Sequence, residues 1–365
     1  MDRYKSFFRG IAYAGYCIVF LFAVYTFEKS IPDQIYVKAG EAIDYQFQVP
    51  VTMEIQEDSS PVAKSTNNAN VRQSYIVTCR LFGIFPVKDI EVVLVDGDAV
   101  YAGGMPIGIY VKTRGVLVIG TSEVERPDGS EAAPAENILK AGDYILSVNG
   151  EKVAEKEDLQ RLVQQNGAEK EILKINRKGE EVEVGVTPVQ NKNGTYMLGA
   201  WVRDDLAGIG TLTYYKEDGT YGALGHAVSD GDVGERIQMR EGYVYNAQII
   251  GVKKGQKGNP GELSGMIRYQ SADCLGTIEE NTDIGIYGKL DGNIAALPRG
   301  DYYNICYKQD IKQGPATIIC GFTGEKKEYA IEIESLDYSG REANKGILFR
   351  VTDEQLLYMT GGIVQ

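Results

Sequence analysis

With 365 residues, the chain is long enough for two or three domains that each bury a core of their own. Its 51 Asp and Glu residues outnumber 38 Lys and Arg residues, which gives a formal net charge of -13. This charge repels phosphate backbones, so we expect no nucleic-acid partner. The 43 Gly and 24 Tyr residues, against only 11 Pro, favour a mainly β protein whose short strands are joined by glycine-bearing turns.

The five cysteines do not form a metal-binding pattern. No two of them are spaced as Cys-x-x-Cys, and the chain has a single histidine to complete a site. We therefore predict no zinc site and no cofactor. The cysteines can be free thiols or form one or two disulfides, which the sequence leaves open. They are Cys17, Cys79, Cys274, Cys306 and Cys320.

An uncharged, apolar run covers residues 10–27, which is long enough to span a bilayer. Basic residues precede the run, and Glu28, Lys29 and Asp33 follow it, so the positive-inside rule leaves the N-terminus cytoplasmic. A cleaved signal peptide and a buried core helix are the alternatives. Because no Ala-x-Ala cleavage site follows, we predict a cytoplasmic tip and a single-pass signal anchor over residues 1–30, with the rest extracytoplasmic.

The next segment, residues 31–97, is predicted to be a small β module. Polar and apolar residues alternate over residues 35–55 and again over residues 74–96, as they do in half-buried strands. Residues 57–70 between them are rich in Ser, Asn and Asp and have no periodicity, so we expect a mobile loop there. No chemistry is visible in this module.

Residues 100–189 combine short strands with one helix, which we expect over residues 156–165 because Leu159, Leu162 and Val163 form an apolar face. The sequences Met105-Pro-Ile-Gly-Ile109 and Leu139-Lys-Ala-Gly-Asp-Tyr-Ile-Leu-Ser-Val-Asn-Gly150 precede this helix. Together they resemble a PDZ domain.

The PDZ resemblance implies a peptide-binding loop at Ile107, Gly108 and Ile109. In PDZ domains a glycine-containing loop offers backbone N-H groups to the C-terminal carboxylate of a peptide, which adds a strand to the sheet. An acidic insertion over residues 123–136 departs from the compact PDZ pattern and lies where it can alter access to the groove. The alternative is that this domain only packs against its neighbour.

The remaining segment, residues 196–365, is again rich in glycine and in alternating runs, over residues 243–252, 314–322 and 329–336. This pattern predicts an all-β barrel or sandwich. The segment contains His226, the only histidine of the chain, in Gly222-Ala-Leu-Gly-His-Ala-Val-Ser-Asp230. Any imidazole base chemistry must use His226, although a lone histidine among small apolar residues is commonly structural.

Three sequences in this segment resemble the SpoIVB family of sporulation serine peptidases. The first surrounds His226, the second is Gly255-Gln-Lys-Gly-Asn-Pro-Gly-Glu262, and the third is Thr352-Asp-Glu-Gln-Leu-Leu-Tyr-Met-Thr-Gly-Gly-Ile-Val-Gln365. The order of anchor, β module and PDZ-like domain is also similar to that family. The resemblance implies a mainly β fold whose C-terminal domain is an all-β barrel of the trypsin-like clan.

The resemblance also implies site residues. His226 is expected to be the general base and Asp353 the carboxylate that orients it, with Asp230 as the alternative. The nucleophilic serine is expected beyond Gln365, so we expect an incomplete peptidase domain and an inactive chain as given. Ser264 is the best internal substitute, but it lacks the Gly-x-Ser-x-Gly pattern and is expected in a plain turn.

The acidic stretch over residues 230–235 fits only part of a calcium-binding pattern, so we expect a solvated turn and no metal.

The implied function is that of a serine endopeptidase in sporulation signalling. Its expected substrate is a membrane-bound protein that regulates an intramembrane protease, whose release triggers processing of a sigma-factor precursor. The expected location is the membrane that faces the space between mother cell and forespore. The alternative is a membrane-anchored, non-catalytic protein whose PDZ-like groove binds C-terminal peptides.

Overall fold

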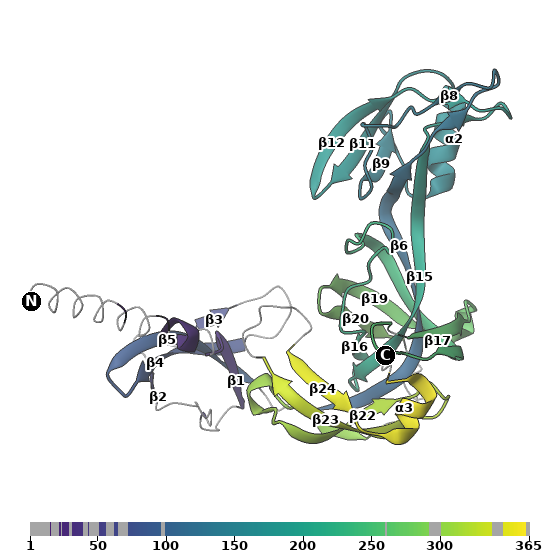
Figure 1. Cartoon of the computed structure of the whole chain (residues 1–365). Coiled ribbons are helices and arrows are strands. Elements are labelled where there is room, and N and C mark those ends of the chain that lie inside the picture. Colours follow the sequence, from purple (N-terminus) through teal and green to yellow (C-terminus); the bar gives the residue numbers. More distant parts are fainter. Residues whose placement is uncertain are drawn as a thin grey trace, which may run out of the picture. The chain divides into compact units, whose positions relative to one another are not determined.

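The structure is a computed structural model (Figure 1). Its chain divides into two compact units. It describes residues 15, 22, 24–28, 31–38, 43, 51–55, 62–64, 72–95, 99–259, 261–291, 301–337 and 346–362. Strands dominate these residues, which confirms the predicted mainly β class. Each unit is described below by itself.

The first unit contains residues 1–100, 302–317 and 330–352, and its main element is a five-stranded sheet with the order β1-β5-β4-β2. Strand β1 is parallel to β5, and β3 pairs with β4. One face of the sheet buries alternate residues, among them Ile90 and Val92 of β5, as the predicted alternation requires. The strands are β1 (Gln34–Lys38), β2 (Val51–Ile55), β3 (Val62–Lys64), β4 (Arg72–Leu81) and β5 (Phe85–Val95).

The predicted loop over residues 57–70 is wrong at residues 62–64, which form β3; the rest of that segment lies outside the described residues. A second difference is that residues of the C-terminal half contact this sheet. Gln309 donates a hydrogen bond of 2.5 Å to the backbone oxygen of Tyr36. Tyr307 also stacks on Tyr36, with ring centroids 5.6 Å apart. Residues far beyond position 97 therefore pack on the N-terminal sheet, while the domain boundaries themselves stay a prediction.

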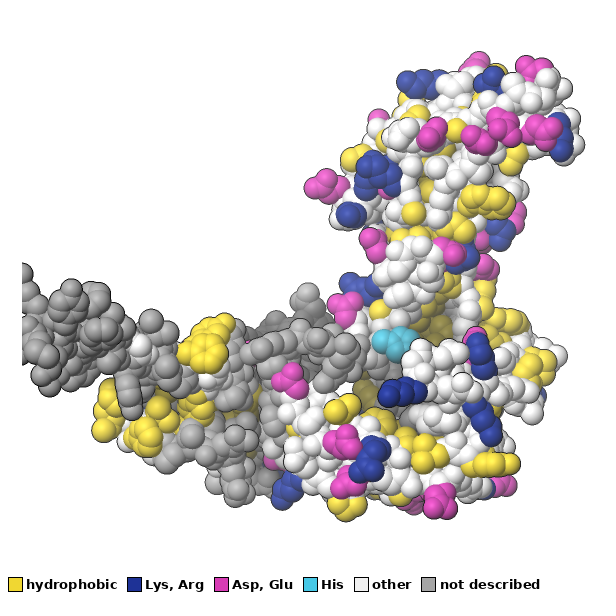
Figure 2. Space-filling model, in the orientation of Figure 1, with side chains coloured by type: hydrophobic (Ala, Val, Ile, Leu, Met, Phe, Trp, Pro, Cys, Tyr) yellow, Lys and Arg dark blue, Asp and Glu magenta, His cyan; other side chains and the backbone are white. Residues whose placement is uncertain are grey.

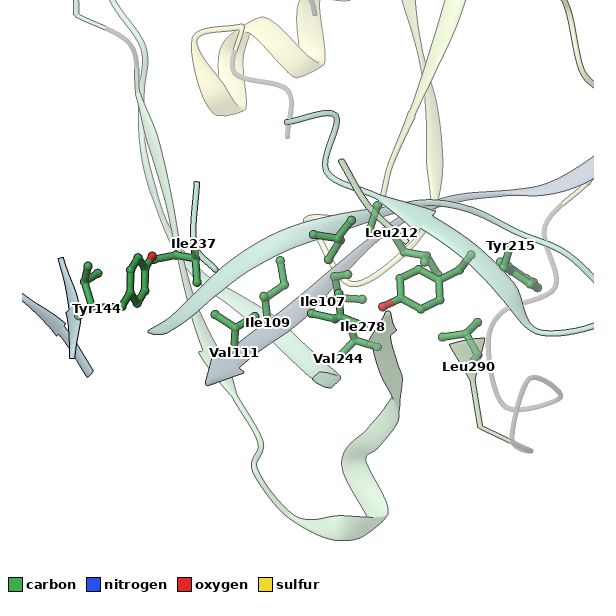
Figure 3. Packing of buried hydrophobic residues seen from close by; sticks show 14 residues of the cluster. Ile107, Ile109, Val111, Tyr144, Leu212, Tyr215, Ile237, Val244, Ile278 and Leu290 are labelled. Atoms are coloured by element: carbon green, nitrogen blue, oxygen red, sulfur yellow. The ribbon is translucent and has the colours of Figure 1, made fainter. Parts of the chain in front are cut away.

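Six strands of the second unit pair in a closed ring, in the order β6-β15-β16-β20-β19-β17, because β17 also pairs with β6. Buried side chains from all six strands meet inside it, and Figure 3 shows Ile107, Val244 and Ile278 among them. Tight strand contacts need glycine: a Cβ atom on Gly288 would lie 2.0 Å from the backbone oxygen of Thr277. The strands are β6 (Ala99–Thr121), β15 (Ala200–Tyr215), β16 (Thr220–Ala223), β17 (Met239–Lys253), β19 (Cys274–Thr282) and β20 (Gly285–Leu290).

Strands β6 and β15 continue beyond the ring into a second hydrophobic core, where helix α2 (Lys156–Asn166) packs (Figure 1). The helix begins with a capping box formed by Glu155 and Asp158, which satisfies backbone N-H groups at its first turn. Its buried residues are Leu159, Leu162 and Val163, which confirms the predicted helix and its apolar face. The other strands here are β7 (Val124–Glu125), β8 (Glu131–Ala132), β9 (Tyr144–Val148), β10 (Glu151–Lys152), β11 (Glu171–Arg177), β12 (Glu180–Val186), β13 (Val189–Gln190) and β14 (Tyr196–Met197).

The C-terminal segment adds a three-stranded sheet with the order β22-β23-β24, followed by helix α3 (Glu354–Thr360). Its strands are β22 (Gly314–Cys320), β23 (Lys327–Leu336) and β24 (Ile347–Val351). The remaining elements are β18 (Glu262–Ile267), β21 (Tyr302–Asn304) and the short 3-10 helices η1 (Ser271–Asp273) and η3 (Lys308–Asp310).

No helix within the described residues is long and apolar enough to cross a membrane. Of the predicted membrane segment, residues 10–27, the structure describes only Gly15, Phe22 and residues 24–27. The rest of that segment lies outside the described residues, so the anchor stays a prediction.

Candidate functional site

His226 lies on an exposed turn that follows β16. The two residues before it have a positive φ, 74° at Leu224 and 118° at Gly225. A leucine in this region is a backbone outlier, and such outliers gather at functional sites. The backbone N-H of Leu224 donates a hydrogen bond of 3.1 Å to the oxygen of Thr211, which holds the turn against β15.

The imidazole of His226 contacts the next residue of the chain, since its Nδ1 lies 2.9 Å from the backbone oxygen of Ala227. A carbonyl oxygen can only accept, so Nδ1 carries the proton in this hydrogen bond. In the neutral ring, Nε2 then keeps its lone pair, which is the state a general base requires.

The side chain of Asn281, from β19, holds the segment that follows His226. It accepts a hydrogen bond of 2.8 Å from the N-H of Val228 and donates one of 2.9 Å to the oxygen of the same residue. It donates a further one, of 3.2 Å, to the oxygen of Ile237. A single asparagine in a strand leaves no periodic or motif signal, so Asn281 does not stand out in the sequence.

Asp230 is almost fully buried and shapes the turn over residues 230–235. One carboxylate oxygen accepts from the N-H groups of Asp232 and Val233, at 2.8 and 3.0 Å, and the other accepts from Arg203. Both carboxylate oxygens of Asp230 are therefore hydrogen-bonded, one within the turn and the other to Arg203 of β15. Within the part of the chain that the structure describes, no three His, Cys, Asp or Glu side chains gather as a metal site.

Asp353 is the N-cap of α3, where its carboxylate accepts a hydrogen bond of 2.9 Å from the N-H of Leu356. No hydrogen bond or ion pair among the described residues joins His226 to Asp353 or to Asp230. The structure therefore describes both candidate carboxylates without assembling a triad.

Helix α3 nevertheless brings two of the three family-like sequences together. The N-H of Gly255 donates a hydrogen bond of 3.0 Å to the oxygen of Thr360, the last residue of the helix. Beside it, Lys254 lies 4.4 Å from the ring centroid of Tyr358. Gly361 fits so closely that a Cβ atom there would lie 2.3 Å from the oxygen of Gly255.

Ile107, Gly108 and Ile109 do not form the predicted peptide-binding loop. They lie in the middle of β6, where residues 208–210 of β15 pair with them on one side and residues 244–246 of β17 on the other. Their backbone lies between two paired strands, so the loop prediction is wrong. Gly108 has a packing role, because a Cβ atom there would lie 2.4 Å from the side chain of Ile267.

Farther along β6, residues 117–121 pair with residues 200–203 of β15, next to α2. Ala200 and Val202 pack against the hydrophobic core of this part. A peptide that adds a strand to this edge of β6 would need the position that β15 occupies.

Ser264, the internal substitute considered for the nucleophile, lies in β18 and is exposed. It pairs with Gly251 of β17, so the predicted turn at Ser264 is wrong.

A pocket of about 400 Å³ opens beside His226, over the middle of β15. Figure 2 shows the single histidine at the edge of a hollow in which hydrophobic side chains are visible. The pocket and the imidazole therefore face the same space. Its lining residues are Ile109, Leu206, Ala207, Gly208, Ile209, Leu224, His226, Ala227, Val228 and Ser229.

Two family models match the chain. SpoIVB peptidase S55 matches residues 194–365, and the PDZ domain matches residues 127–177. Among solved structures, the PDZ domain of the SdrC-like protein from Listeria monocytogenes is similar over 24% of this chain and 87% of that one, with 18% identity. The TM-score of 0.21 is too low to support an argument. The comparison with curated proteins gave no match.

Proposed function

This chain carries an S55 serine peptidase domain of the SpoIVB type and a PDZ domain, and we propose that it is an endopeptidase with His226 as its general base. The observation that carries this proposal is the imidazole itself. It is the only one in the chain, it is exposed at a pocket, and its Nδ1 binds a carbonyl oxygen. Nε2 is thus the nitrogen that accepts the proton of a serine hydroxyl.

The nucleophile of this reaction is a serine that the family resemblance places after Gln365 in the complete reading frame. The serine Oγ attacks the peptide carbonyl, its proton passes to Nε2 of His226, and the same proton then goes to the leaving amine.

Asp353 is the proposed orienting carboxylate. Only one of its oxygens is engaged in the hydrogen bond to Leu356, and among the described residues the other makes none. A movement of α3 that brings this oxygen to Nδ1 would replace the carbonyl of Ala227 as the acceptor. The charge of Asp353 would then stabilise the imidazolium that forms during the reaction. Asp230 is a weaker candidate because one of its oxygens is engaged in the turn and the other by Arg203.

The closed ring of six strands supports the further proposal that the peptidase domain is a barrel of the trypsin-like clan, which β6 from the preceding segment completes. Active sites in such folds use residues from strand ends and loops. The turn after β16 that carries His226 is of this kind.

The cellular setting is also a proposal. The apolar run over residues 10–27 supports a single-pass anchor with the peptidase domain outside the cytoplasm, and the family description supports a role in sporulation. The proposed substrate is then a membrane-bound regulator of an intramembrane protease, whose cleavage starts sigma-factor processing.

Peptide binding without hydrolysis is the second candidate function, and the PDZ match favours it. The edge of β6 next to α2, however, is paired with β15. In this candidate His226 has no role, so His226→Ala leaves function intact.

The test is cleavage of unfolded casein by the protein from the complete reading frame, followed by mass spectrometry. We expect His226→Ala to lose cleavage while it keeps the unfolding midpoint of the wild type, and Asp353→Asn to be strongly impaired. Undiminished cleavage by His226→Ala overturns the proposal.

A further inference from the structure

The pocket beside His226 has a composition that selects among substrates. Five of its lining residues have large aliphatic side chains, and none is Asp, Glu, Lys or Arg. A charged substrate group would lose its hydration here without gaining an opposite charge among the described residues, whereas an apolar group gains by leaving water. The five are Ile109, Leu206, Ile209, Leu224 and Val228.

The size of the pocket fits a large side chain with some adjoining backbone. Its volume of about 400 Å³ lies in the lower part of the range for small-molecule sites. Leu224 forms one wall in its positive-φ conformation, which also positions the turn of His226. The wall of the pocket and the proposed base are therefore parts of one short turn.

Glycines of β15 keep this space open. A Cβ atom on Gly210 would lie 2.3 Å from Leu224 and 2.8 Å from Ile109, both of which line the pocket. Side chains two positions apart in a strand point to the same face, so a side chain on Gly208 would also point toward this side. A Cβ atom on Gly208 meets no atom within 4 Å, which leaves that space to a ligand.

We propose that this pocket is a subsite for a large apolar side chain of the substrate, such as leucine, methionine or phenylalanine, close to the peptide bond that is cut. The inference rests on the proposed function, because it takes His226 as the base of the reaction. Gly208 determines the specificity of this subsite, because its lack of a side chain leaves the space that the substrate side chain fills.

The first measurement detects binding without any catalysis. His226 gives the only histidine signal of the protein, so its imidazole resonance in NMR spectra needs no assignment by mutation. We titrate the protein with N-acetyl-leucine amide and, in parallel, with N-acetyl-aspartate amide. The leucine compound is expected to shift the His226 signal in a saturable way, and the aspartate compound is expected to leave it unchanged.

The variant Gly208→Val fills the pocket, so it is expected to abolish the leucine-dependent shift. Its matched control is Gly120→Val, at another strand glycine where an added Cβ meets no atom within 4 Å, in β6 and outside the pocket lining. The control is expected to keep the shift. Equal responses of the two variants, or equal responses to the two amides, overturn the inference.

The second measurement uses the protein from the complete reading frame and peptides that carry leucine or aspartate at each position around the cut. We expect kcat/KM to be at least about tenfold higher with leucine at one position, and Gly208→Val to remove this preference. Cleavage with no preference contradicts the subsite and leaves the peptidase proposal standing. A leucine-dependent shift that Gly208→Val abolishes, without cleavage of any peptide, supports the pocket as a binding site and contradicts the proposed function.

Discussion

The side-chain amide of Asn281 holds both backbone groups of Val228, at 2.8 and 2.9 Å, two residues after the only histidine of the chain. An asparagine is suited to this because its oxygen accepts while its nitrogen donates. The position of His226 thus depends on a residue of β19, more than fifty positions later in the sequence.

Asn281→Ala is expected to lower the free energy of unfolding by about 1–3 kcal/mol, because three backbone groups lose their partner. Asn281→Asp is expected to be comparably harmful, since a carboxylate cannot donate to the oxygens of Val228 and Ile237. Urea unfolding measures both changes. Asn193→Ala, at an exposed position, is the control and should change stability by less than about 0.5 kcal/mol. A wild-type unfolding curve for Asn281→Ala would show that the loop does not need this side chain.

The turn before His226 needs glycine at position 225. Gly225 has a φ of 118°, so Gly225→Ala is expected to cost about 1–3 kcal/mol through the backbone alone. Gly231→Ala is the matched control, because a Cβ there also meets no atom within 4 Å and its φ is not positive. Thermal unfolding is measured for both variants, and the lower midpoint is expected for Gly225→Ala. Equal midpoints would contradict the strained turn.

The part of the chain next to α2 contains an ion pair between a buried carboxylate and a partly exposed arginine, which can be broken selectively. Arg177 donates two hydrogen bonds of 2.7 Å to Asp143, whose side chain is 1% exposed. Arg177→Ala leaves this carboxylate buried and unpaired, so we expect a loss of about 3–5 kcal/mol. Lys192→Ala, which breaks the exposed pair with Glu125, is expected to cost less than about 1 kcal/mol. Similar losses in urea unfolding for the two variants would argue against the buried pair.

Burial raises the pKa of the Cys320 thiol from its ordinary value near 9 to about 11. The unfolded thiol therefore loses its proton first as the pH rises, so the contribution of Cys320 to stability is intact below pH 9 and falls away between pH 9 and 11. At pH 10 the expected loss is about 1 kcal/mol relative to pH 7.5.

This loss is measured as a difference between wild type and Cys320→Ala, because the other groups that titrate above pH 9 are common to both proteins. The stability gap between the two is expected to narrow from pH 7.5 to pH 10. A gap that stays constant over this range would show that the folded thiol titrates normally.

The sequence predicted the elements whose signal is local. The helix of Leu159, Leu162 and Val163 follows from a 3.6-residue period, and His226 stood out because it has no alternative in the chain. The structure differs from these predictions where pairing between distant strands determines the conformation. Ile107, Gly108 and Ile109 match a loop motif, yet strands from distant segments pair with them on both sides.

Long-range contacts also explain what the sequence could not predict of the site. Three features of the site join segments that are far apart in the chain. They are the hydrogen bonds of Asn281 to Val228, the ion pair between Asp230 and Arg203, and the pocket over Gly208. Neither the periodicity nor the residue spacing of the sequence indicates such long-range contacts. The role of Asp353 as the N-cap of α3 is a local signal, because aspartate is a preferred N-cap residue.

The central claim is that His226 activates a serine, and labelling with a fluorophosphonate tests it most directly because this reagent reacts with activated serines. The protein from the complete reading frame is labelled, and the modified residue is found by mass spectrometry. The account predicts one labelled serine after Gln365 in the wild type, no label in His226→Ala, and retained label in the control Asn193→Ala. Equal labelling of the wild type and His226→Ala, or an unlabelled wild type, would contradict it.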